Sequence, residues 1–197
     1  MEAKHVAIAV LAAGNARRFG SDKLMADLDG APLGLPVAQQ LAQVDAAAHF
    51  AVCQPQATIA SHYADLGYDI IDNPQADLGL SVSLHLAVEA AAKTEAQALL
   101  VALADMPFVP ASHVEALIAA CEGETIQSSD ANQPMPPAIF PRAMWALLLE
   151  TKGDAGARQI LLNAMTLAAP TGSLRDIDTP DDLAASKALP HRIDPAA

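Results

Sequence analysis

The sequence predicts an α/β protein with a three-layer, doubly wound architecture, in which helices cover both faces of a mainly parallel sheet. Short apolar runs recur along the chain, and segments with apolar residues at helical spacing separate them. Strands that alternate with helices favour βαβ units, and therefore parallel pairing. The 197 residues, of which 52% are hydrophobic, suffice for the core of one such domain. We expect this domain to span 1–190 and a short, loosely ordered tail to span 191–197.

In the first half of the chain, three apolar runs are typical of strands, and two segments between them have the apolar spacing of helices. The first run is β-branched and continuous, which is typical of a strand buried on both faces. The expected strands span Val6–Leu11, 49–53 and 68–71, and the expected helices span 36–44 and 58–66.

In the second half, Ala98–Leu103 is the most apolar run and is expected at the centre of the sheet. The polar, proline-containing stretch 123–137 is expected to form a loop or extension that borders the site and acts as a lid. The remaining expected elements are a helix from about Ser112, a short strand at 138–140, a helix at 141–149 that packs Trp145 into a core or interface, and a strand, turn and helix start over 174–183.

Composition and charge exclude several kinds of partner. A net charge of −12 argues against a nucleic-acid partner, since binding to a phosphate backbone relies on clustered cations. Cys53 and Cys121 are isolated, which is typical of small buried residues in a reducing compartment. No apolar run reaches the length of a membrane span, and the short one near the N-terminus fits a first strand better than a targeting segment. We therefore expect a cytoplasmic protein that binds no membrane.

A cationic loop follows the first strand. The strand runs into Ala12, Ala13 and Gly14, and the loop beyond carries Arg17, Arg18 and Lys23 in an otherwise acidic chain. Small residues let a phosphate approach backbone N–H groups, and the cations offset its charge. The glycine spacing of a P-loop and of a Rossmann turn is absent, so polyphosphate binding is predicted from the pattern as a whole. A solvated basic loop is the alternative.

A glycine and two serines mark the start of the helix expected after residue 79. Ser81 or Ser83 could cap this helix, which is the simpler explanation. Gly79 and Ser81 could instead form an anion or ribose site, because unpaired N–H groups point outward at a helix N-terminus.

Two aspartates are candidates for a metal site. Asp105 follows the central strand, at the edge where α/β sheets bind their ligands. Two prolines delay the next helix, so Ser112 is the better cap and Asp105 is free to bind a magnesium ion. Near the C-terminus, Thr179 and Asp182 match a capping box, which leaves Asp178 unassigned. A simple helix cap is the alternative role for Asp105.

Four separated motifs occur in order over nearly the whole chain: LAAG…RFG…K, NP…GLSxSL, DMPFV and DIDTP. Together they resemble the MobA-like nucleotidyltransferases, a family with a Rossmann-like fold. The LAAG and GLSxSL forms resemble the MocA-type branch, the molybdenum cofactor cytidylyltransferases. This resemblance implies that Arg18, Lys23 and Asp105 are catalytic and that Asp105 and Asp178 hold Mg²⁺. The nucleotide-binding residues it implies are Leu11, Ala12, Ala13, Gly14, Lys23, Asn73, Gly79, Ser81 and Asp105.

The segment from Lys152 to Arg158 is similar to the family's G-D-x-G-A-R element, with Ala155 in place of a common lysine. In relatives this element borders the acceptor pocket, which implies that Asp154, Gly156 and Arg158 bind the acceptor phosphate. A helix start with Asp154 as its cap and a solvated Arg158 explains the same residues equally well. The family's G-H-P element is also absent, since Asn132-Gln133-Pro134 occupies its place.

The resemblance implies transfer of CMP from CTP to the terminal phosphate of molybdenum cofactor, with release of pyrophosphate. CTP and a molybdopterin-type acceptor are the implied partners, and a molybdenum hydroxylase is a candidate recipient of the product. A nucleotidyltransferase that uses GTP, or that acts on a sugar or alcohol phosphate, would share the same nucleotide site. A carrier or insertion protein for molybdenum cofactor is a non-catalytic alternative, although it would have no need for Lys23 and both aspartates.

Overall fold

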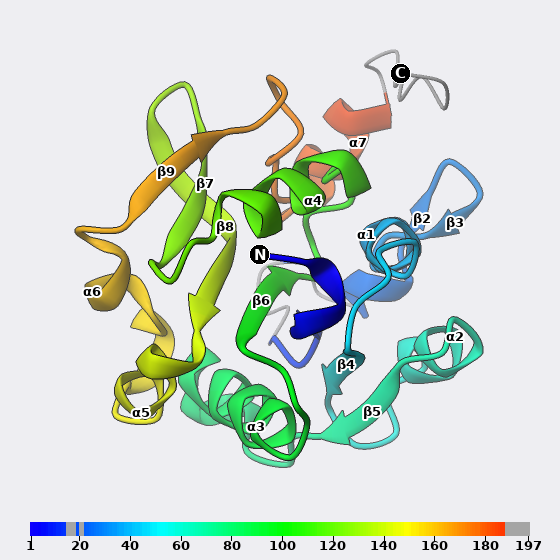
Figure 1. The fold of residues 1–197 in the computed structure, drawn as a ribbon. Coiled ribbons are helices and arrows are strands. Elements are labelled where there is room, and N and C mark those ends of the chain that lie inside the picture. Colours follow the sequence, from blue (N-terminus) through cyan, green and yellow to red (C-terminus); the bar gives the residue numbers. More distant parts are fainter. Residues whose placement is uncertain (15–18, 20–21, 188–197) are drawn as a thin grey trace.

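The computed structural model describes residues 1–187 except 15–18, 20 and 21 (Figure 1). Within these residues, one sheet has the strand order β5-β4-β1-β6-β8-β7-β9. β8 is antiparallel to both of its neighbours and the other pairs are parallel, so the sheet is mainly parallel, as expected. The strands are β1 (Val6–Leu11), β4 (Ala48–Cys53), β5 (Asp69–Asp72), β6 (Ala98–Leu103), β7 (Ile126–Asp130), β8 (Gln133–Pro141) and β9 (Met165–Ala168).

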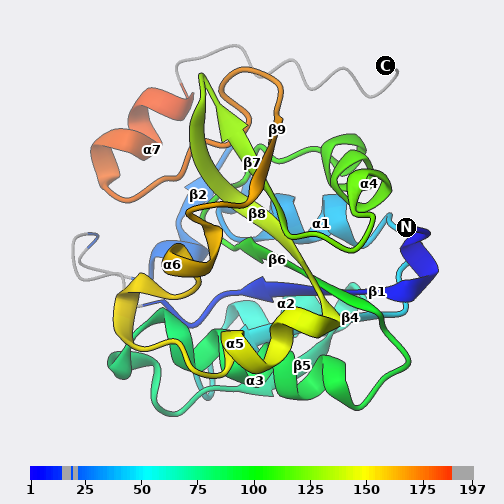
Figure 2. The same cartoon turned by 60° about the vertical axis from the view of Figure 1, so that its left-hand side comes forward.

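Helices cover both faces of this sheet, so the three-layer prediction is confirmed. The helices α1 (Leu35–Leu41), α2 (Ile59–Asp65) and α4 (Ala111–Ala120) pack on one face, and α3 (Leu80–Ala92) and α5 (Trp145–Leu148) pack on the other. In Figure 2, α1 and α4 lie above the sheet and α3 and α5 lie below it. Alternation along β1 explains the two cores, because Ile8 and Val10 face the first layer while Ala7 and Ala9 face the second.

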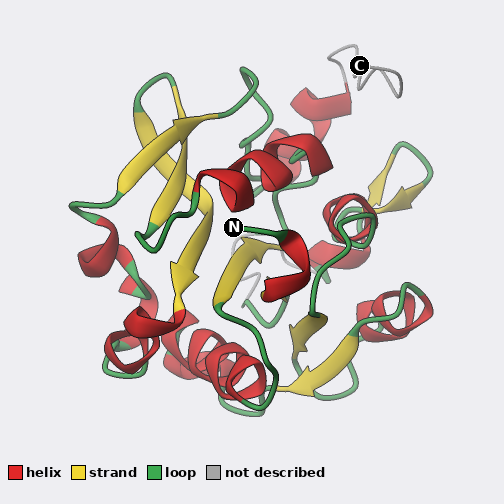
Figure 3. Cartoon of the chain, viewed as in Figure 1, coloured by secondary structure: helices red, strands yellow, loops and turns green. Residues whose placement is uncertain are grey.

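The remaining elements are short. A hairpin of β2 (Asp27–Leu28) and β3 (Ala31–Pro32) stands apart from the main sheet (Figure 3). Two further α-helices are α6 (Arg158–Leu161) and α7 (Pro180–Lys187). Single 3₁₀ turns span Ala3–His5, Lys23–Met25, Ala76–Leu78, Arg142–Met144 and Gly153–Ala155.

The carboxyl ends of β1, β4 and β6 meet at one edge of the sheet. Backbone pairing continues past the strand ends, since the Ala12 N–H donates to Val52 (2.8 Å) and the Ala104 N–H donates to Leu11 (3.1 Å). The loops that follow β1 and β6 are therefore held side by side. Ligands of open α/β sheets bind at this kind of edge.

The stretch 123–137 is not the predicted loop or lid, because β7 and most of β8 lie within it and pair antiparallel in the central sheet. Ser128, which is polar but buried, explains why the polar composition of this stretch was misleading. Its hydroxyl donates to the Pro137 carbonyl (2.8 Å) and lies 2.9 Å from His113 Nε2, so a polar side chain is satisfied inside the sheet. Strand β9 was not predicted, and the segment expected as a strand before residue 178 pairs in neither described sheet.

Helix starts confirm one predicted cap and correct two others. The predicted capping box forms. The Thr179 N–H donates a hydrogen bond to Asp182 Oδ2 (2.8 Å), and the Asp182 N–H donates one to Thr179 Oγ1 (3.2 Å). No side-chain hydrogen bond caps α3 or α4, so the predicted caps at Ser81 or Ser83 and at Ser112 were wrong. Both α3 serines are buried within the helix instead.

The helix predicted over 141–149 begins as a 3₁₀ turn, and only its second part is α-helical. Trp145 is buried there, as expected, and its indole N–H donates to the Phe140 carbonyl (3.2 Å). Among the described residues, no helix is long and apolar enough to cross a membrane. The predicted tail at 191–197 lies outside the described residues.

Candidate active site

Lys23 lies between two carboxylates from distant parts of the chain. Its ammonium nitrogen is 2.8 Å from Asp105 Oδ2 and 2.8 Å from Asp178 Oδ1. Asp105 lies two residues beyond the end of β6, and Lys23 begins the 3₁₀ turn that follows the cationic loop. The Ile177 N–H donates to the Asp105 carbonyl (3.0 Å), which holds Asp178 beside the end of β6. Three residues singled out in the sequence therefore meet at one point.

Burial and charge together define the chemistry of this cluster. The Lys23 side chain is only 10% exposed. Burial lowers the pKa of its ammonium, but the ion pairs with Asp105 and Asp178 outweigh this effect and raise the pKa above its ordinary value. Burial, and to a lesser extent the neighbouring Asp178, raise the pKa of the Asp176 carboxyl above its ordinary value. Counting only the described residues, carboxylates outnumber ammonium groups around this cluster, which favours a further cation.

One carboxylate oxygen of Asp105 could still bind a metal ion. Its Oδ1 is buried and has no hydrogen-bond partner among the described residues. A buried carboxylate oxygen without a partner is costly, so it calls for an ion or a water. No group of three or more histidine, cysteine, aspartate or glutamate side chains suited to a metal is found in the described part of the chain. Two carboxylates suit Mg²⁺, which keeps waters and phosphate oxygens as its other ligands.

A cavity of about 490 Å³ opens beside this cluster. Its lining includes Leu11, Ala12 and Gly14 from the predicted nucleotide loop, together with Lys23 and both aspartates. Ala13 is buried, and its carbonyl accepts a hydrogen bond from Gln54 Nε2 (3.1 Å). Gln54, which the sequence analysis did not single out, thus ties the nucleotide loop to the end of β4. Arg18 lies outside the described residues.

The predicted nucleotide residues Asn73, Gly79 and Ser81 do not line this cavity. Asn73 is 1% exposed, and both ends of its amide are used, because Nδ2 donates to Ser83 (2.9 Å) and Oδ1 accepts from the Gln75 N–H (3.0 Å). It therefore fixes the turn that leads into α3. Direct nucleotide contacts from these three residues remain a prediction.

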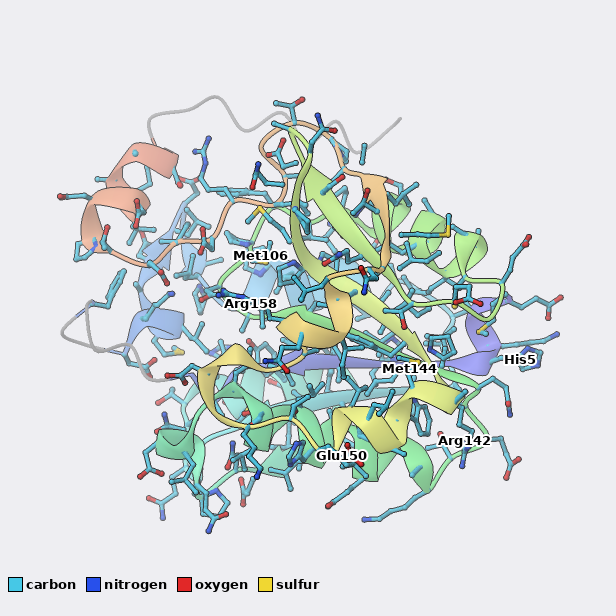
Figure 4. The ribbon with its side chains drawn as sticks, turned by 90° about the vertical axis from the view of Figure 1, so that its left-hand side faces the viewer. His5, Met106, Arg142, Met144, Glu150 and Arg158 are labelled. Carbon is cyan, nitrogen blue, oxygen red and sulfur yellow. The ribbon has the colours of Figure 1, made fainter. Side chains whose placement is uncertain are left out.

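A second pocket, of about 540 Å³, lies on the α3 side of the sheet. Asp154 and Arg158 line it, as does Leu11, which also lines the first cavity. Figure 4 shows Arg158 beside α6, away from Glu150 and Met144 near α5. Gly156 is buried, and a Cβ there would lie 3.2 Å from Leu80. Two of the three predicted acceptor residues therefore line a pocket that shares Leu11 with the first cavity.

Two predicted loops are in direct contact at Gly79. A Cβ at this position would lie 2.5 Å from the carbonyl carbon of Gly153 and 2.8 Å from the Asp154 nitrogen. Its φ of 108° also lies where side chains are disfavoured. The loop before α3 and the segment before α6 are thus packed backbone to backbone.

A family model described as the MobA-like NTP transferase domain matches residues 8–168. The chain belongs to this family. The matched region contains Lys23, Asp105 and Leu11, the end of β1 that lines both cavities. The match confirms the family membership that the motifs implied.

Two relatives match this MobA-like protein over nearly its whole length. The purine catabolism protein PucB of Bacillus subtilis is 27% identical over 187 residues, which cover 87% of this chain and 91% of PucB. The Rv0371c homologue from Mycobacterium sp. strain JC1 is 25% identical, with a TM-score of 0.76 and coverage of 94% and 98% of the two chains.

Two more distant structures share the fold. Molybdopterin-guanine dinucleotide biosynthesis protein A of Archaeoglobus fulgidus is 22% identical, with a TM-score of 0.64 and coverage of 92% and 97%. Rv0371c of Mycobacterium tuberculosis, crystallised as a manganese complex, is 19% identical, with a TM-score of 0.72 and coverage of 93% and 98%. At these identities the likeness shows the nucleotidyltransferase fold alone.

Gly79→Ala tests the contact between the two loops. We expect it to lower the free energy of unfolding by about 1–3 kcal/mol more than Gly123→Ala, because an added methyl group would overlap the backbone at Gly153. Gly123 is a matched control, since it has the same φ of 108° and no atom within 4 Å of an added Cβ. Urea denaturation measures both, and equal losses would show that backbone strain alone explains Gly79.

Proposed function

We propose that this protein transfers CMP from CTP to the terminal phosphate of a molybdopterin-type acceptor and releases pyrophosphate. The observation that carries the proposal is the Lys23–Asp105–Asp178 cluster, which opens onto a cavity at the end of β1. A second pocket shares Leu11 with this cavity, so two substrates would have room on either side of the strand end. The LAAG and GLSxSL forms of the motifs support CTP as the nucleotide.

The reaction requires positioning and charge neutralisation more than covalent chemistry. An oxygen of the acceptor phosphate attacks the α-phosphorus of CTP, and the bond to the bridging oxygen breaks, so that pyrophosphate leaves with the electron pair. Lys23, whose raised pKa keeps it protonated at neutral pH, would pair with the triphosphate and then with the leaving pyrophosphate. Arg18 would assist from the loop that follows β1. Leu11, Ala12 and Gly14 would support the nucleotide through the wall that they form.

Mg²⁺ is the proposed cofactor, and the residues present fit it. Asp105 offers an unpartnered buried oxygen, and Asp178 brings a second carboxylate to the same point. When bound, Mg²⁺ would neutralise phosphate charge and polarise the α-phosphate. Lys23 now occupies the space between the two carboxylates, so a triphosphate that attracts Lys23 would free them for the cation.

Nucleotide selectivity is the first test. The melting temperature is measured with Mg²⁺ and each of CTP, GTP, ATP and UTP, because a ligand that binds the native state raises it by mass action. We expect selective stabilisation by CTP, retained in Lys187→Ala and lost in Lys23→Ala. Lys187 is a matched control, since it forms a remote and more exposed ion pair with Asp27 (2.9 Å). Selective stabilisation by GTP would contradict the proposal that CTP is the nucleotide. No response to any nucleotide would contradict the proposal that the protein is a nucleotidyltransferase.

Turnover tests the proposed catalytic residues. We expect Lys23→Ala and Asp105→Ala each to lower the rate of pyrophosphate release at least a hundredfold, because each removes charge that the transition state needs. The ion pair of Lys187 and Asp27 supplies the controls, and Lys187→Ala and Asp27→Ala should keep the rate within about twofold. A near-normal rate in a folded Lys23 or Asp105 variant would remove that residue from the mechanism.

Cation binding in the absence of nucleotide tests the competition at the carboxylates. Mn²⁺ binding is followed by the electron paramagnetic resonance of the free ion. We expect Lys23→Met to bind Mn²⁺ at least tenfold more tightly than the wild type, because it removes the ammonium that now neutralises Asp105 and Asp178. Lys187→Met should leave the affinity unchanged. An equal or weaker affinity in Lys23→Met would show that Lys23 does not compete with the cation.

A further inference from the structure

The floor of the second pocket, meaning the part that the sheet strands form, is apolar except at one residue. Side chains of β6 and β8 form most of it, and Gln127 of β7 adds a carboxamide. Gln127 pairs in register with Ala138, which also lines the pocket, and is itself only 5% exposed. A buried polar side chain in an apolar floor is informative, because burial of an amide is costly unless it is hydrogen-bonded.

The carboxamide of Gln127 is only partly satisfied by the protein. Its Nε2 donates to the Leu161 carbonyl at 2.7 Å, and this is the one hydrogen bond of the side chain among the described residues. The bond fixes the orientation of the amide. A carboxamide has two N–H donors and an oxygen with two acceptor positions, so one donor and the oxygen are left for a ligand.

We propose that Gln127 is a specificity-determining residue that recognises the ring edge of the acceptor. The ring would be a flat heterocycle with a hydrogen-bond donor next to an acceptor, as in a lactam. A carboxamide pairs with such an edge through two hydrogen bonds, as glutamine does with base edges in DNA. This inference rests on the proposed function, since it assumes that the second pocket holds the acceptor.

The rest of the pocket supports a flat ring and argues against a polyol. Val101, Leu103 and Phe140 in the floor would stack against a ring but would leave sugar hydroxyls without partners. Arg158 also lines the pocket and supplies a cation for a phosphate. Leu11, common to both cavities, brings the acceptor phosphate close to the nucleotide.

A purely structural role for Gln127 would be to anchor the end of α6 through Leu161. The two roles differ in their response to a change in the ligand. If Gln127 contacts the ring, removal of the carboxamide and methylation of the ring edge remove the same interaction, so their effects are not additive. If Gln127 only anchors α6, the two effects are independent.

The experiment measures binding of neopterin monophosphate, a fluorescent pterin phosphate, to the full chain by fluorescence quenching. The wild type, Gln127→Met and Ser128→Ala are compared. Ser128 is a matched control, because it lies on the same strand, is also buried and makes its hydrogen bonds with His113 and Pro137 outside the second pocket. Ribose 5-phosphate is the competing polyol phosphate. The derivative methylated at N3 of the pterin probes the lactam edge and is measured with both the wild type and Gln127→Met.

We expect Gln127→Met to weaken pterin phosphate binding at least tenfold and Ser128→Ala to change it less than twofold. N3-methylation should weaken binding to the wild type by a similar factor and cause no further loss in Gln127→Met. Ribose 5-phosphate should not displace the pterin. If Gln127→Met does not fold, an unchanged affinity of the wild type for the N3-methyl derivative still overturns the proposal.

Other outcomes separate this inference from the proposed function. Equal binding by the wild type and Gln127→Met overturns the role of Gln127 and leaves the proposed function intact. No pterin binding by a wild type that responds to CTP overturns both this inference and the proposed acceptor. Gln127-dependent pterin binding by a protein that ignores every nucleotide supports the inference and overturns the proposed transfer.

Discussion

The ammonium of Lys23 between Asp105 and Asp178 is the interaction on which the arrangement of the site depends. The two partners lie 82 and 155 residues further along the chain, so only the completed fold brings them together. A strand end, the loop after β1 and the approach to α7 each contribute one charge. Two carboxylates this close repel each other, and the buried cation between them offsets that repulsion. The ion pairs that join these three distant segments thus involve the same charges that the proposed chemistry requires.

The fold was predictable where local pattern and tertiary environment agree. Val6–Leu11 and Ala98–Leu103 are apolar throughout because both faces of these strands are covered. A continuous apolar run in the sequence therefore predicts each strand directly. The β7–β8 hairpin was missed because Ser128 is polar yet buried, and its satisfaction depends on His113 and Pro137. Composition describes how polar a segment is, whereas strand formation there depends on partners elsewhere in the chain.

The three charged residues of the candidate site could also be singled out from the sequence, for a related reason. Asp105 stands out after a strand end and Asp178 beside a capping box, and neither is used as a cap, while Lys23 stands out as a cation in an acidic chain. Asn73 follows the same kind of motif, but its amide is used inside the protein, which a motif cannot show. Gln54 and Gln127 have no charge and no distinctive neighbours. Each is held by a hydrogen bond to a carbonyl group that is remote in sequence, that of Ala13 for Gln54 and that of Leu161 for Gln127.

The packing of Gly79 against Gly153 and Asp154 limits how this protein can diverge. Where two backbones touch without an intervening side chain, neither segment can move without displacing the other. A lineage that altered the segment before α6 to accept a different phosphate would need a compatible shift in the loop before α3. The two segments are therefore expected to be inherited as a unit, and a graft of one without the other would disturb the packing beside the second pocket.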